Sequence, residues 1–231
     1  MKQKIIQFEG LDGTFKETNS NLIKDYLQLK GYNAHIMHFP RYDSDSSIFA
    51  RKYLNSEYKD ISDPYIISTF FAYDMLDAFE ELKNRADYND IKFIICDRYI
   101  GSNMIYQSTL LDKEYKDKKN LTIQKLKFIN KLDRLYDKLN LPKPDLTIYL
   151  NLKPELSNII LQNRTNTDIY ESNLKYLKSV YNTGKLVSTI KSWNIVNCQY
   201  NDSDISLNNV KNKTEIFTDI KRILEKELNI K

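Results

Sequence analysis

The chain has 231 residues, of which 41% are hydrophobic and 29% are charged, and its formal net charge is +4. This length fits one α/β domain over residues 1–231, and the charge is too mild to predict binding to nucleic acid. No apolar run approaches the roughly 20 residues that a membrane-spanning helix needs, so we expect no membrane partner.

Cys96 and Cys198 are the two cysteines, and each lies in apolar surroundings far from the other in sequence. Neither a CxxC pair nor metal-ligand spacing is present, so we expect two reduced thiols in the core of a cytosolic protein. The first residues run directly into a strand pattern, without the charged and apolar regions of a signal peptide. These features predict a cytoplasmic location.

Short apolar runs alternate with longer amphipathic segments along the chain. The short runs predict strands over residues 4–9, 34–39, 92–96, 145–150 and 193–197. Apolar residues at helical spacing predict helices over residues 16–30, 64–83, 121–139, 155–163, 173–190 and 214–228. This alternation is typical of an α/β fold with a parallel sheet covered on both faces. Ligands bind such sheets at the carboxyl ends of the strands, so the segments that follow the strands form the candidate site.

A loop with two glycines follows the first strand over residues 10–18, GLDGTFKET. Gly10, Gly13 and Lys16 are in register with the Walker A pattern GxxxxGK[ST] of phosphate-binding loops. The glycines of such loops let backbone N–H groups surround the phosphates, and the lysine reaches the β- and γ-phosphates. The alternative is an ordinary strand–turn–helix connection with a surface lysine.

Two positions of this loop depart from the Walker A pattern. Phe15 stands where the glycine before the lysine belongs, and Glu17 stands where the Mg²⁺-binding Ser or Thr belongs. Thr18 is then the hydroxyl residue nearest to that position. A side chain at position 15 either clashes with a triphosphate or forces another loop shape.

Arginines follow the second and third strands. Pro40 fixes a turn after the second strand and directs Arg41 toward the sheet edge, where a guanidinium suits a monophosphate. A solvated surface arginine is the alternative. Asp97 and Arg98 end the third strand, which predicts a carboxylate near Mg²⁺ and an arginine between donor and acceptor phosphates. The combination with Lys16 favours a phosphate site over a surface ion pair.

A short polar stretch lies between two predicted helices after the fourth strand. It starts at Arg164 and continues through Asp168, Tyr170 and Glu171. We expect a short lid over the nucleotide phosphates around residues 164–172. A plain connection between two helices is the alternative.

Taken together, these segments resemble the thymidylate kinase family from end to end. FEGLDG with a following lysine resembles the family's phosphate-binding loop, and Phe39-Pro40-Arg41 its acceptor-phosphate loop. Asp97-Arg98-Tyr99 is similar to its DR[YH] signature, and LPKPDLTIYLNLKPE at residues 141–155 to a further segment. The resemblance implies a three-layer P-loop NTPase fold with a five-stranded parallel sheet. It also implies Mg²⁺-dependent transfer of a phosphoryl group from ATP to dTMP.

The resemblance implies roles at three groups of positions. ATP would contact Gly10, Gly13, Thr14, Phe15, Lys16, Glu17 and Thr18. The substrate dTMP would contact Asp12, Arg41, Phe71, Arg98, Ser102, Tyr106, Gln107 and Tyr170. The catalytic residues would be Lys16, Asp97, Arg98 and Arg164, with Asp97 and Thr18 as Mg²⁺ ligands. A homodimer is also implied, through the apolar half of the helix at residues 64–83.

Departures from the family pattern keep three hypotheses open. The first is an active dTMP kinase. The second is a weakened relative that binds a nucleotide or a partner protein, which Phe15, Glu17, Met75 and the short lid favour. The third is a kinase for another pyrimidine deoxynucleoside monophosphate, because Met75 stands where the family usually has an arginine for the thymine edge. A positive φ at Phe15, or a ring that fills the phosphate site, would weaken the first hypothesis.

Overall fold

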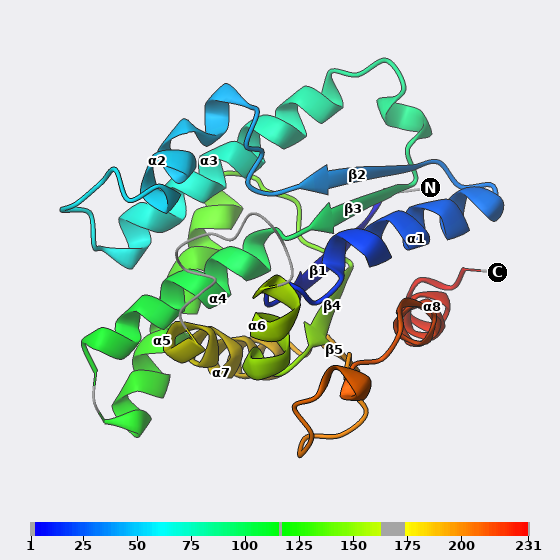
Figure 1. Ribbon diagram of the computed structural model, residues 1–231. Coiled ribbons are helices and arrows are strands. Elements are labelled where there is room, and N and C mark those ends of the chain that lie inside the picture. Colours follow the sequence, from blue (N-terminus) through cyan, green and yellow to red (C-terminus); the bar gives the residue numbers. More distant parts are fainter. Residues whose placement is uncertain (1–2, 116, 163–173, 231) are drawn as a thin grey trace.

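The computed structural model describes residues 3–115, 117–162 and 174–230, and its centre is a five-stranded sheet (Figure 1). Neighbouring strands pair in parallel in the order β2-β3-β1-β4-β5. Their carboxyl ends therefore meet at one edge of the sheet. The strands are β1 (Lys4–Gly10), β2 (Ala34–His38), β3 (Phe93–Asp97), β4 (Leu146–Asn151) and β5 (Asn194–Asn197).

Helices cover both faces of the sheet and complete three layers (Figure 1). Helices α1 and α8 pack together on one face, whereas α3, α4, α5 and α7 lie on the other. The short helix α2 packs on α3, and α6 packs on α7. The predicted α/β fold class is thereby confirmed. The helices are α1 (Lys16–Leu29), α2 (Ile48–Leu54), α3 (Pro64–Lys83), α4 (Ile100–Leu110), α5 (Lys118–Lys138), α6 (Pro154–Gln162), α7 (Leu174–Ile190) and α8 (Lys213–Leu228).

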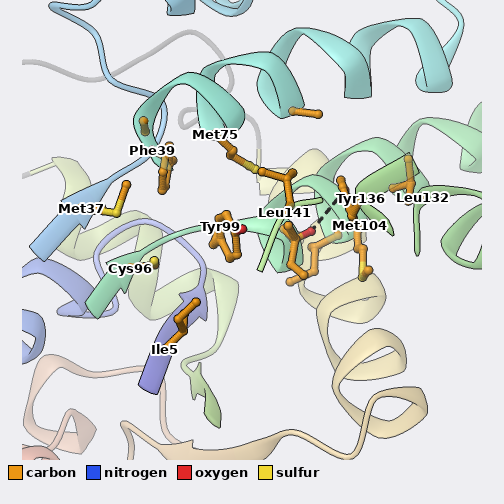
Figure 2. Packing of buried hydrophobic residues seen from close by; sticks show 14 of the residues in the cluster. Ile5, Met37, Phe39, Met75, Cys96, Tyr99, Met104, Leu132, Tyr136 and Leu141 are labelled. Carbon is orange, nitrogen blue, oxygen red and sulfur yellow. Dashed lines mark hydrogen bonds between the residues drawn. The ribbon is translucent and has the colours of Figure 1, made fainter. Parts of the chain in front are cut away.

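Side chains of the central strand β1 alternate between two hydrophobic clusters. Ile6 and Phe8 are buried against the α1 and α8 layer, whereas Ile5 is buried in the cluster on the opposite face. This period of two is the geometry of a strand covered on both sides. Figure 2 shows part of the second cluster, where Phe39 and Tyr99 point into the space beneath the helical layer. Because side chains alternate along β1, Glu9 lies on the same face of the sheet as Ile5.

The predicted elements match the observed ones with ends displaced by at most three residues, but the helices α2 and α4 were not predicted. Helix α4 is buried around most of its circumference, so it lacks the polar stripe of an amphipathic helix. Helix α2 has only 7 residues, too few for a periodic pattern. Both unpredicted helices form walls of the pocket described below.

Both cysteines are buried free thiols, as predicted. Burial raises the pKa of each thiol above its ordinary value. Within the described part of the chain, no helix combines the length and the apolar character needed to cross a bilayer.

Candidate active site

The loop between β1 and α1 adopts a backbone that glycine favours at several positions. Gly10 has φ 145° and Gly13 has φ 75°, and a Cβ added to Gly10 would lie 2.6 Å from the carbonyl oxygen of Leu150. Thr14 is buried, and its Oγ1 donates to the Leu11 carbonyl at 2.7 Å, which braces the loop from inside. The first two glycines therefore allow a close turn over the end of β4.

Of the two features of Phe15 that would weaken the hypothesis of an active kinase, the structure shows the positive φ. Its φ of 63° and ψ of 26° lie in the left-handed region, which costs a residue with a side chain roughly 1–2 kcal/mol. This backbone counts against an active kinase. The ring, however, packs against the hydrophobic cluster beneath α1 and α8. The ring position therefore does not add to the case against ATP binding.

Lys16 begins α1 and is buried beneath the loop. Its Nζ donates to the carbonyl oxygens of Gly10 at 3.2 Å and Leu11 at 2.7 Å, and lies 3.9 Å from a carboxylate oxygen of Asp12. Burial, with the charge of Arg98 second, lowers the pKa of Lys16 to about 8. An anion would remove that penalty, so the site suits a phosphate.

The two residues after Lys16 are exposed. Thr18 follows Lys16 by two positions, which corresponds to about 200° of rotation around an α-helix. Its hydroxyl is therefore directed away from the face that carries Lys16, and this geometry argues against a Mg²⁺ role for Thr18. Glu17 is one position closer and carries a carboxylate instead of a hydroxyl.

Arg98 follows β3 in the left-handed conformation, with φ 64°. Its Nη1 donates to Ser102 Oγ and to the Tyr106 hydroxyl, each at 3.2 Å, and its Nη2 pairs with Asp12. Burial opposes its charge, but the carboxylate of Asp12 and other neighbours raise the pKa of Arg98 well above its ordinary value. This guanidinium is held charged between the phosphate loop and α4.

Asp97 ends β3 next to the phosphate loop and lies 3.4 Å from His38 Nδ1. Burial raises its pKa, but the hydrogen bond from His38 and the charges of Lys16 and Arg98 outweigh burial and lower it overall. An ionised Asp97 is a suitable oxygen ligand for Mg²⁺, which usually binds one or two carboxylates together with substrate phosphates. Across residues 3–115, 117–162 and 174–230, no three His, Cys, Asp or Glu side chains cluster as a self-sufficient metal site.

A pocket of about 150 Å³ opens beside Arg98. Five of the residues to which the family resemblance gives a dTMP contact line it, namely Asp12, Phe71, Ser102, Tyr106 and Gln107. Its walls are largely aromatic, which suits a planar base. Sequence analysis missed further lining residues, namely Tyr42, Tyr53, Leu54, Asn103 and Tyr176.

Met75 also lines the pocket and is almost fully buried. The family resemblance implies an arginine at this position, where the chain has a thioether. Asn103 is a second buried residue of the pocket, and its Nδ2 donates to the Ser68 carbonyl at 2.9 Å. The pocket therefore presents an amide and a thioether among its lining groups.

Among the residues that the structure describes, Arg41 is the predicted acceptor-site residue that does not line the pocket. Its Nε pairs with Asp74 at 3.0 Å, while its two Nη atoms pair with Asp77 and Glu81, all on α3. Ser46 accepts a further hydrogen bond. Arg41 thus ties the segment after β2 to α3. Arg164, Tyr170 and the lid around residues 164–172 lie outside the described residues.

Glu9 is a fully buried carboxylate that sequence analysis did not select. One of its oxygens accepts from the Tyr99 backbone N–H at 3.0 Å, and the other accepts from the Ser102 hydroxyl. Burial is the main cause that raises the pKa of Glu9 to about 7. Strand alternation places it beneath Arg98, but the sequence pattern alone did not reveal its partners.

Comparison with known proteins identifies the family. The sequence model described as thymidylate kinase matches residues 8–208. Thymidylate kinase of Mycobacterium tuberculosis (strain CDC 1551 / Oshkosh) is 28% identical over 166 residues, which cover 71% of this chain and 73% of that protein. The enzyme of Plasmodium falciparum (isolate 3D7) is 28% identical over 225 residues, covering 93% and 91%.

Among solved structures, thymidylate kinase from Candida albicans has the same fold. It superposes with a TM-score of 0.68 at 21% identity, covering 100% of this chain and 94% of that one. The family match covers most of the chain, and the described loop, arginine and pocket lie inside it. The chain belongs to the thymidylate kinase family of nucleoside monophosphate kinases.

Proposed function

We propose that this protein transfers the γ-phosphoryl group of ATP to dTMP, giving ADP and dTDP. The position of Arg98 carries the proposal, because its guanidinium lines the aromatic pocket and pairs with Asp12 of the phosphate loop. A cation there can offset the charge of the acceptor phosphate and of the group in transfer. The three proteins compared above are all thymidylate kinases.

The acceptor nucleotide would occupy the pocket. We propose that the base stacks on Phe71, that the sugar lies near Asp12 and Tyr106, and that the phosphate meets Arg98. Ser102 and Gln107 complete the polar lining. Arg41 would support this end indirectly, because its guanidinium is bound to α3.

The donor nucleotide would lie along the loop at residues 10–16, with its phosphates near Lys16. Asp97 is the residue that would hold a Mg²⁺ ion, which would offset the negative charge of the donor phosphates. An oxygen of the dTMP phosphate then forms a bond to the γ-phosphorus as the bond to the β,γ-bridging oxygen breaks. ADP leaves with that electron pair, so the protein supplies position and charge and no covalent intermediate.

The direct test mixes purified protein with ATP, Mg²⁺ and dTMP and follows ADP release. Turnover should be lost in both Lys16→Ala and Arg98→Ala. A wild-type protein that produces no ADP, while dTMP still raises its melting temperature, would contradict the proposal. That outcome would favour the second hypothesis, a relative whose acceptor pocket survives and whose donor loop, altered at Phe15 and Glu17, does not.

A different acceptor base is favoured by one observation. Met75 offers a thioether to the pocket where a hydrogen-bonding side chain would discriminate among bases. A panel of dTMP, dUMP and modified pyrimidine deoxynucleoside monophosphates, compared by kcat/KM, separates this candidate from strict dTMP specificity.

We further propose a homodimer, as the family resemblance implied. Ile66, Phe70 and Tyr73 recur at helical spacing on α3, and Phe49 of α2 stacks on Phe70 at 5.7 Å between ring centroids. Ile66 and Tyr73 are 47% and 54% exposed, so this apolar stripe faces outward. A cytoplasmic location stays a prediction from the sequence.

A further inference from the structure

Glu9 is an unusual residue for its position, because β1 is the central strand and this side chain is fully buried. A buried carboxylate is costly unless hydrogen bonds and opposite charge stabilise it. The roles assigned to the ATP and dTMP sites leave Glu9 without a function. Its partners, however, all belong to the segment that carries Arg98.

The contacts of Glu9 form a directed chain of hydrogen bonds. Arg98 Nη1 donates to Ser102 Oγ at 3.2 Å, and the Ser102 hydroxyl donates in turn to a carboxylate oxygen of Glu9. The other carboxylate oxygen accepts from the Tyr99 N–H at 3.0 Å, which fixes the turn between β3 and α4. The carboxylate accepts at both ends and leaves the Ser102 lone pairs free for Arg98.

The start of α4 lies unusually close to Glu9. A Cβ added to Gly101 would stand 2.9 Å from Glu9 Cγ, so a side chain at position 101 would push the helix away. Arg98 itself has a left-handed backbone, a conformation that a residue with a side chain keeps only when its surroundings enforce it. The close packing and the two accepted hydrogen bonds supply that enforcement.

We propose that Glu9 is a positioning residue that sets the direction of the Arg98 guanidinium toward the acceptor phosphate, acting through the hydroxyl of Ser102. This inference rests on the proposed function and extends it to a residue that does not line the pocket. The proposal predicts a specific pattern of binding. Loss of Glu9 should weaken binding of the phosphate and leave binding of the nucleoside intact.

Protonation of Glu9 should act like its replacement by glutamine. A protonated carboxyl or an amide carries a donor, which must face either the Ser102 hydroxyl or the Tyr99 N–H and thereby breaks the directed chain. The charged groups that act on Glu9 are Arg98 and Lys16. The neutral titratable groups around it are Cys96, Tyr106, Tyr136 and Tyr149.

The experiment compares Glu9→Gln with wild type by calorimetric binding of dTMP and of thymidine. We expect the Kd of dTMP to rise about tenfold, which is one charge-assisted hydrogen bond, and the Kd of thymidine to change less than about twofold. The effect of the substitution on dTMP should shrink between about pH 8 and about pH 6, as wild-type Glu9 takes up its own proton. The titration of the dTMP phosphate is common to both proteins and cancels in the ratio.

Two further variants test the link through Ser102 and provide a control. Ser102→Ala removes the link and should reproduce the phosphate-specific loss, and the double variant should lose little more than either single one. Asp112→Asn is the matched control, because Asp112 also accepts from a serine, Ser179, and pairs with a lysine, Lys125, away from the pocket. It should leave the dTMP to thymidine affinity ratio unchanged.

Equal loss of dTMP and thymidine affinity in Glu9→Gln would overturn the proposal, as would additive effects of the two variants. The binding ratio does not depend on turnover. A wild-type protein that binds dTMP more tightly than thymidine but releases no ADP would therefore contradict the kinase function alone. Circular dichroism and melting temperatures establish that each variant is folded before its binding is compared.

Discussion

At the scale of single residues, Phe15 affects the stability of the folded state in two opposite ways. Its left-handed backbone costs roughly 1–2 kcal/mol, while its half-buried ring gains free energy by packing beneath α1 and α8. Phe15→Gly removes both effects, whereas Phe15→Ala loses the ring and keeps the strain. We expect the glycine variant to be more stable than the alanine variant by about 1 kcal/mol.

Urea unfolding of the two variants measures this difference. Glycine also makes the unfolded chain more flexible, which lowers stability, so the expected order holds only if position 15 is left-handed. An alanine variant that is equally stable or more stable would contradict the backbone conformation. The same pair should show whether the strain matters for the donor, because ATP affinity should be equal in both if only the ring were relevant.

A second prediction concerns Glu9 and the dependence of the unfolding free energy on pH. Its pKa of about 7 is raised above the ordinary value of 4.5, mainly by burial, so the folded state holds a proton that the unfolded state has released between these values. Its contribution to stability is full below about pH 4.5 and is lost as the pH rises to about 7. The loss should be on the order of 3 kcal/mol.

Glu9→Gln lacks this titration. The unfolding free energy of wild type minus that of the variant should therefore fall as the pH rises from about 4.5 to about 7. Chemical denaturation at several pH values measures it. A constant difference across that range would show that Glu9 is ionised throughout, and that Arg98 compensates its burial fully.

The residues that sequence analysis found and missed differ in one respect. Asp97 and Arg98 lie at the carboxyl end of β3, and Lys16 follows the loop after β1, where the rule for parallel sheets already directs attention. Glu9 lies within a strand, and its partner Ser102 is 93 residues away in the chain. Long-range pairing of that kind leaves no local pattern, so a single sequence does not reveal it.

At the scale of secondary structure elements, α3 carries more of the site than its pattern indicated. The sequence placed it over Pro64–Lys83, as observed, and the structure adds Asp63 as its N-terminal cap. Its acidic side chains bind Arg41, which the sequence assigned to the acceptor phosphate. That pairing depends on how the segment after β2 folds back, and a strand-end rule does not describe it.

Arg41 should behave as a structural link between that segment and α3. Arg41→Ala leaves the buried Asp74 with fewer partners, so we expect a loss of about 3 kcal/mol in unfolding free energy. Glu81→Ala is the matched control: Glu81 is largely exposed, and its removal should cost less than about 1 kcal/mol. Denaturant titration compares the two.

Ligand binding separates the structural role of Arg41 from the phosphate role. A link between elements should change dTMP and thymidine affinities together, because it shapes the wall that includes Tyr42 and Tyr53. A loss confined to dTMP would show that the guanidinium leaves α3 and binds the phosphate, as the family resemblance implied.

At the scale of the whole molecule, strand and helix alternation was enough to predict a parallel sheet with two helical layers. The order β2-β3-β1-β4-β5 brings β1 and β3 side by side, and this adjacency joins the phosphate loop to Arg98. Helix α4 escaped prediction because it is buried on most sides. The long amphipathic helices were found, whereas the most buried helix and the seven-residue α2 were not.

Assembly is the last property at this scale. The stripe of Ile66, Phe70 and Tyr73 on α3 is exposed along one face, so a second copy of the chain that covers it would bury apolar surface. Tyr73→Glu puts a charge in the stripe without disturbing the stacked pair of Phe49 and Phe70. We expect a dimer for wild type and a monomer for this variant in sedimentation velocity.

Leu29→Glu is the matched control, because Leu29 is 88% exposed at the end of α1, on the opposite face of the sheet. It introduces the same charge at another exposed apolar position and should remain dimeric. If the dimer persists in Tyr73→Glu but dissociates in Leu29→Glu, the interface lies on the α1 layer and the proposed interface on α3 is wrong. Because the pocket lies beneath α3, the interface on that helix predicts that the monomeric variant also binds dTMP more weakly.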